Sequence, residues 1–98
     1  MAKSIIQEDR SRCYICGKNA SADYFGLDEH HVFFGPDRKY SEMYGLKVYI
    51  CHDSCHLNGV HKDAKLNRSL QRKVQKIAME HYKWSIEDFR ERFGRNYL

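Results

Sequence analysis

The chain has 98 residues, with 17 Lys and Arg against 13 Asp and Glu, and it contains six His and four Cys. This length fits one domain, expected to span residues 1–98, and so small a core often needs a metal or disulfide staple. An apolar fraction of 42% argues against disorder, and no apolar run reaches the roughly 18 residues that a membrane span needs. Because the first residues hold no stretch typical of a secretory signal, we expect a cytoplasmic protein whose cysteines bind metal.

Two strands are predicted in the first half of the chain. Residues 1–12 are mixed and polar and are expected to form a flexible lead-in in which Ile5 and Ile6 pack loosely. Residues 24–34 end in aromatic and β-branched residues around a pair of histidines, which indicates a strand. Residues 35–45 begin with Gly-Pro-Asp and end in glycine, which predicts a loop. Residues 46–51 alternate apolar side chains on one face with Lys and Tyr on the other, which predicts a second strand.

The second half is predicted to be helical. Residues 52–61 form a turn or short helix, and a longer helix follows from Asp63 to about Tyr82. The apolar stripe expected to face the core consists of Leu66, Leu70, Val74, Ile77 and His81. A last helix over about 86–93 is indicated by Ser85 with an Asp three residues later, a variant of the capping box, and by the glycine at position 94.

Two pairs of cysteines are the strongest single signal. Cys13 and Cys16 are separated by two residues, and Cys51 and Cys55 by three. Four thiolates can close a tetrahedral zinc site with no open position, which predicts a structural Zn²⁺ that contributes to the folding free energy. Disulfides would need an oxidising compartment, and a redox CxxC would need a βαβ context that this sequence lacks.

Five of the six histidines lie close to these cysteines or to one another: His30, His31, His52, His56 and His61. With C-x2-C, then DEHHV, then a strand ending in C-x3-C-H and the segment HLNGVH, residues 13–61 resemble the HNH endonucleases, in particular small phage and prophage proteins. The closing EDFRERFGRNYL resembles the tails of such phage proteins. The resemblance implies an α+β fold, with a zinc-stapled, treble-clef-like ββα-metal core over residues 13–61 and C-terminal helices over residues 62–98.

The resemblance also implies a catalytic site. His31 would be the general base that takes a proton from water, and His30 and His56 would hold a divalent metal such as Mg²⁺, Mn²⁺, Ni²⁺ or Zn²⁺. His61 would be a third metal ligand, and Asn58 would be an orienting residue. The ion would bind the scissile phosphate of DNA and stabilise the charge that develops on it. The protein would then be a hydrolase that acts on phosphodiester bonds.

The sequence departs from the family pattern in two places. Leu46 stands where many HNH proteins have Asn, and the second cysteine pair has three intervening residues where two are common. A shifted arrangement, with Glu29 as ligand and His30 as base, also remains open. Neighbouring side chains on a strand point to opposite faces, so His30 and His31 can share one pocket only if local twist or a bulge brings them together.

Basic side chains concentrate in the second half, where residues 50–98 carry ten basic and six acidic residues, against seven of each in residues 1–49. Lys and Arg at helical spacing can follow a phosphate backbone without reading its sequence. The residues predicted to contact DNA are Arg38, Lys39, Lys65, Arg68, Arg72 and Lys76. The alternative is a solvated helix face.

A second function stays open beside the nuclease. The chain can also be a non-catalytic zinc module that contacts nucleic acid or a protein partner as a phage accessory factor, with its histidines used only in packing. No membrane partner is expected. The sequence leaves room for a homodimer, or for a phage or host protein partner in the host cytoplasm.

Overall fold

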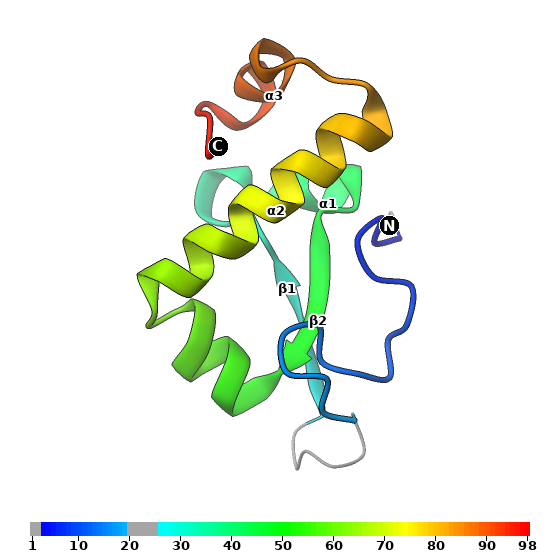
Figure 1. Cartoon of the computed structure of the whole chain (residues 1–98), viewed down its shortest axis with the longest axis vertical. Coiled ribbons are helices and arrows are strands. Elements are labelled where there is room, and N and C mark those ends of the chain that lie inside the picture. Colours follow the sequence, from blue (N-terminus) through cyan, green and yellow to red (C-terminus); the bar gives the residue numbers. More distant parts are fainter. Residues whose placement is uncertain (1–2, 20–25) are drawn as a thin grey trace.

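A two-stranded antiparallel sheet lies at the centre of the fold, made of β1 (Leu27–His31) and β2 (Lys47–Cys51) (Figure 1). The computed structural model describes residues 3–19 and 26–98. His30 pairs with Val48, and His31 pairs with Lys47. Both strands fall within the ranges predicted for them. Together with the helices that follow, they form a small α+β domain, so the predicted fold class is confirmed at this level.

The segment between the strands is helical, so the loop predicted over residues 35–45 was wrong. A 3-10 turn, η2 (Gly35–Asp37), leads into helix α1 (Arg38–Tyr44), which ends at Gly45 in the left-handed conformation with φ of 71°. A proline is compatible with the first turn of a helix, where its missing N–H costs nothing, and glycine is favoured just after the last turn. Gly-Pro at one end and Gly at the other therefore mark a short helix here.

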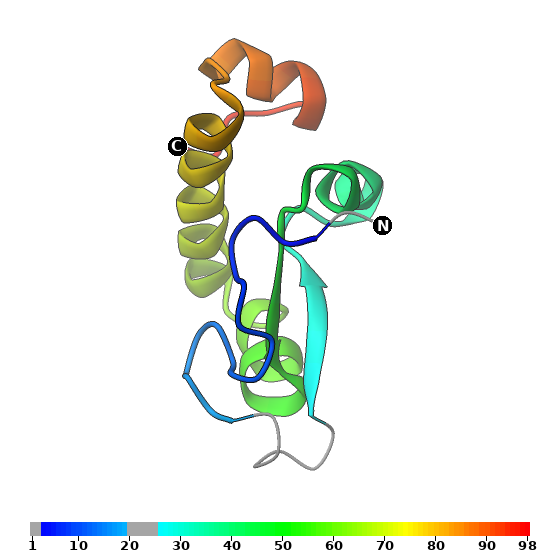
Figure 2. The same cartoon turned by 90° about the vertical axis from the view of Figure 1, so that its right-hand side faces the viewer.

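The chain leaves β2 directly into η3 (His52–Val60), which is a π-helix, and then enters α2 (Ala64–Tyr82). Figures 1 and 2 show α2 running across one side of the sheet. Its buried residues are Leu70, Val74, Gln75 and Ala78. The predicted apolar stripe therefore holds at Leu70 and Val74 but fails at His81, which is exposed. Among the described residues, no helix is long and apolar enough to cross a membrane.

Helix α3 (Ile86–Phe93) packs across the C-terminal part of α2 (Figure 1). It begins with the predicted capping box, in which the Ser85 hydroxyl and the Asp88 carboxylate each bond the other's backbone N–H. Phe89 and Phe93 are buried and stack on each other, with ring centroids 4.6 Å apart. Both rings also contact Phe33, which follows β1, so α3 closes the core over the end of this strand.

The N-terminal segment runs along the free edge of β2 and covers part of its second face. Its described residues 3–12 are therefore held against the sheet, with Ile5 and Ile6 packed on the core, and do not form the flexible lead-in that the sequence predicted. The Ile5 N–H donates to the Gly45 carbonyl over 3.0 Å, and the Tyr49 N–H donates to the Gln7 side-chain oxygen over 2.7 Å. The Arg10 guanidinium lies 4.7 Å from the centroid of the Tyr49 ring. Lys47 and Tyr49, which the alternating pattern places on this face, are both buried.

Gly45 gives a test of this packing. Its left-handed φ and the Lys3 carbonyl oxygen, which a Cβ at position 45 would overlap, both exclude a side chain. Gly94 has a φ of 79° but has open space around its Cα. We expect Gly94→Ala to cost about 1 kcal/mol of stability from backbone strain alone, and Gly45→Ala to cost at least about 2 kcal/mol. Thermal denaturation of both variants checks this, and equal melting temperatures would contradict it.

Candidate metal centres

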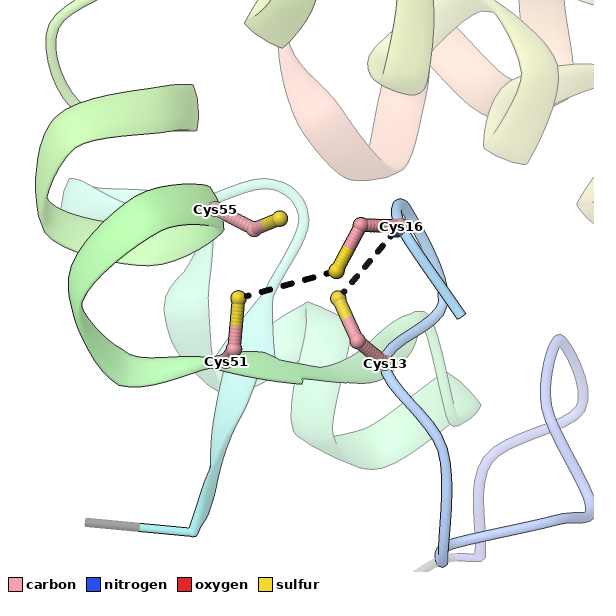
Figure 3. A group of neighbouring side chains, drawn as sticks. All are labelled: Cys13, Cys16, Cys51 and Cys55. Atoms are coloured by element: carbon pink, nitrogen blue, oxygen red, sulfur yellow. Dashed lines mark hydrogen bonds between the residues drawn. The ribbon is translucent and has the colours of Figure 1, made fainter. Parts of the chain in front are cut away.

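Four sulfur atoms meet where the N-terminal segment reaches the end of β2 (Figure 3). Cys13 and Cys16 come from the N-terminal segment, Cys51 ends β2, and Cys55 lies in η3. All four Sγ atoms lie within 4.8 Å of one another, and the Cys16 and Cys51 sulfurs are 3.9 Å apart. A tetrahedron with Zn–S bonds of about 2.3 Å places its sulfurs roughly 3.8 Å apart. The cluster can therefore hold a structural metal such as zinc.

The backbone around Cys13 favours its thiolate form. The Cys16 N–H donates to the Cys13 sulfur over 3.4 Å. Burial alone would raise the pKa of Cys13, but hydrogen bonds from the backbone of Cys16 and Cys51 outweigh it and lower the pKa to about 7. Burial and the neighbouring thiols instead raise the pKa of Cys55. A bound cation would lower this pKa and so allow all four sulfurs to be deprotonated together.

Three histidines form a second cluster, between β1 and η3. His30 comes from β1, His56 from η3, and His61 from the residue that follows η3. The ring centroid of His30 lies 5.1 Å from that of His56 and 5.4 Å from that of His61. The Nε2 atoms of His56 and His61 are 3.0 Å apart. Each residue offers one nitrogen within 4.8 Å of the other two, so the three predicted ligands do come together.

The π-helical turn explains why residues five apart in the sequence meet. The His61 N–H donates to the His56 carbonyl over 3.2 Å, which is the i to i+5 bond of a π-helix. On an α-helix, side chains five residues apart would point about 140° away from each other. The wider turn instead places both imidazoles on the same side, facing His30.

The chemistry of His30 fits a metal ligand. Its Nε2 atom is buried and has no hydrogen-bond partner among the described residues. A buried polar atom left without a partner costs about 1–3 kcal/mol, and a bound cation would remove this cost. Burial, together with the nearby His56 and His61, lowers the pKa of His30 to about 3. The imidazole is therefore neutral at physiological pH, as metal binding requires.

Asp28 orients this cluster, and sequence reasoning missed it. Its Oδ2 atom accepts hydrogen bonds from Nδ1 of both His52 and His56, each over 2.7 Å. Burial alone would raise the pKa of Asp28, but these two bonds outweigh it and lower the pKa. A carboxylate that binds Nδ1–H leaves Nε2 of His56 with its lone pair toward the cluster. Asp28 precedes His30 by two positions on β1, which places both on one face.

His31 lies on the opposite face of β1, apart from the three clustered histidines. Its Nε2 atom is 3.0 Å from the Glu42 carboxylate, and the Lys47 ammonium lies 2.9 Å from the other oxygen of the same carboxylate. Hydrogen bonds from Lys47 and His31 lower the pKa of Glu42 to about 2. Glu29 lies on this face too, 3.7 Å from His31 and 3.5 Å from Lys47. The Lys47 ammonium lies between the two carboxylates in an ion-pair network, and its one positive charge leaves one of their two negative charges unbalanced. Glu29, His31 and Glu42 also lie close enough together to hold a metal ion.

One small cavity nevertheless connects the two faces. It has a volume of about 270 Å³, and its lining residues are Glu29, His30, His31, Phe34, Arg38, His56 and His61. His31 and the three clustered histidines therefore border the same space, together with Arg38, which is one of the predicted DNA contacts. Asn58 is exposed on η3 and does not line this cavity.

The other predicted DNA contacts are spread over the surface. Arg68 and Arg72 line a neighbouring groove, whereas Lys65 and Lys76 are exposed on α2 and line neither space. The Lys39 ammonium lies 5.0 Å from the centroid of the Tyr40 ring and is outside the cavity as well. Only a part of the predicted basic set is therefore close to the histidines.

Fold and side chains together define a small α+β protein whose described residues include a cysteine cluster, a histidine cluster and the group of Glu29, His31 and Glu42, each of which could hold a metal ion. No protein-family model, curated protein or solved structure matches this chain. Evidence on its function therefore comes from the chemistry and geometry of these clusters.

Replacing Cys13 by Ser tests the cysteine cluster. We expect Cys13→Ser to lose one equivalent of zinc and to melt at a markedly lower temperature, because the binding free energy of a structural metal is part of the folding free energy. Ser11→Ala, in the same segment but outside the cluster, should keep both properties. Metal analysis and thermal denaturation provide the measurement. A chelator-treated, zinc-free protein that keeps its full melting temperature would contradict the prediction.

Proposed function

We propose that the protein is a metal-dependent endonuclease of the HNH type that hydrolyses phosphodiester bonds of DNA. The observation that carries this proposal is the shared cavity, in which a candidate general base, His31, and three candidate metal ligands border one space. Arg38 lies at the same cavity and supplies a positive charge for a phosphate. A purely structural zinc domain has no need of this combination.

The metal-binding half of the mechanism rests on His30, His56 and His61. These residues would hold a divalent ion that, when bound, neutralises charge on the scissile phosphate and the leaving oxygen. Among the four metals considered, Zn²⁺ and Ni²⁺ suit three imidazole nitrogens better than Mg²⁺ or Mn²⁺, which prefer oxygen ligands. Asp28 fixes the orientation of His56 for this task.

The proton-transfer half rests on His31 and Glu42. When the neutral His31 ring donates its Nε2–H to the Glu42 carboxylate, Nδ1 carries the lone pair that can take a proton from water. The carboxylate then stabilises the imidazolium that forms. Lys47 holds Glu42 in place from the neighbouring strand. Glu42 is thus a positioning residue for the proposed base.

The strand order also fits the proposed family. β1, β2 and η3 supply two antiparallel strands followed by a helix, with the histidine cluster between β1 and the helix. We interpret this unit as a ββα-metal core in which a π-helix takes the place of the α-helix. Leu46, at the position where many HNH proteins have Asn, is fully buried in the core. Glu42, four residues earlier, contacts His31 over 3.0 Å.

A plasmid-nicking assay tests the nuclease. We expect the wild type to convert supercoiled plasmid to the nicked form with Zn²⁺ or Ni²⁺, and His31→Ala to lower the rate by about 100-fold through loss of the general base. His81→Ala is the matched control, because His81 is exposed on α2 and lies outside the cavity. A wild type that binds DNA but nicks none with any divalent metal would support the non-catalytic zinc module instead.

Glu42→Gln tests the proposed positioning role. The amide keeps the shape of the side chain but loses its charge, so kcat should fall about tenfold while KM changes little. Glu80→Gln, on the exposed surface of α2, is the control and should match the wild type. An unchanged kcat in Glu42→Gln, with the fold intact by circular dichroism, would remove Glu42 from the mechanism.

A further inference from the structure

A groove of about 590 Å³ lies beside the histidine cluster, between the first half of α2 and the segment that follows α3. Among the described residues, its charged side chains are three arginines, namely Arg68 and Arg72 of α2 and Arg95 of the C-terminal segment, and none of its described lining residues is Asp or Glu. Neither Arg68 nor Arg72 forms an ion pair with a carboxylate in the described part of the chain. The groove is therefore complementary to a polyanion.

Phe34 joins this groove to the cavity at the histidines, because its side chain lines both. Phe34 is 40% exposed, and the centroid of its ring lies 5.4 Å from that of His61 and 5.9 Å from that of His30. An exposed aromatic ring next to a basic groove is the arrangement on which a nucleic-acid base stacks.

A further polar side chain lines the groove. Asn67 lines the groove from α2, and its Oδ1 atom is buried without a hydrogen bond among the described residues. Once the amide rotates to expose this oxygen, the oxygen can accept a hydrogen bond from an exocyclic amino group of a base. The groove thus offers cationic, aromatic and hydrogen-bonding side chains in one continuous surface.

We propose that this groove binds the single DNA strand that continues from the scissile phosphate. Phe34 stacks on the base next to the cavity, and Arg68, Arg72 and Arg95 contact the phosphates that follow. A groove of this volume has room for nucleotides of one strand, whereas a duplex is too thick to enter it and would contact only its rim. The position of the DNA strand relative to the scissile phosphate rests on the proposed function, but the binding of single-stranded DNA in the groove does not.

Fluorescence anisotropy with a labelled single-stranded oligonucleotide of about ten nucleotides tests the proposal. The zinc-loaded His31→Ala protein is the background, so that cleavage does not interfere. We expect Phe34→Leu and Arg95→Gln each to raise Kd by about tenfold, and Arg95→Gln also to reduce the salt dependence of binding. Both side chains are exposed, and the control Arg90→Gln removes an exposed arginine of α3 outside the groove.

The outcomes separate this proposal from the nuclease. Unchanged Kd values for Phe34→Leu and Arg95→Gln would overturn it, as would a clear preference for duplex over single strand. A protein that binds single strands through these residues but nicks no plasmid supports the groove and refutes the nuclease. A protein that nicks plasmid, but binds single strands equally well after Phe34 or Arg95 is replaced, supports the nuclease and refutes the groove.

Discussion

The cluster of four cysteines is the contact on which the arrangement of the site depends, because it joins the N-terminal segment to the junction of β2 and η3. Cys51 is the last residue of β2, and Cys55 is the fourth residue of η3. A metal bound by both would therefore set the direction in which η3 leaves the sheet. His56 directly follows Cys55, and its place opposite His30 is therefore coupled to the sulfurs. In so short a chain, such a metal replaces part of the stabilisation that a larger core would provide.

The two faces of strand β1 carry two different groups of polar side chains. Successive side chains alternate, so Asp28 and His30 face η3, whereas Glu29 and His31 face α1 and β2. Each group has its own electrostatic support, from the Asp28 carboxylate on one side and from Glu42 with its lysine partner on the other. Buried polar groups of this kind are costly unless they are partnered, which explains why such paired networks surround the site. The cavity at the end of the strand is where the two groups meet.

Features with a local signal could be predicted from the sequence. The cysteine spacing, both strands, the long helix and the capping box at Ser85 each depend on residues close together in the chain. Other features depend on packing at a distance. The π-turn that aligns His56 with His61 has no local signature. Glu42 reaches His31 only because residues 38–44 form a helix, and a Gly-Pro start is compatible both with a loop and with the first turn of a helix. Likewise, no pattern in the N-terminal segment indicates that it covers β2.

Anomalous X-ray scattering from zinc-soaked crystals, recorded on both sides of the zinc absorption edge, tests the existence of two distinct metal centres most directly. The account predicts one peak among the four sulfurs and a second peak about 2.0–2.1 Å from one nitrogen of each of His30, His56 and His61. A map with zinc at the cysteines and no anomalous density between the three imidazoles would contradict it, and the histidines would then be packing residues.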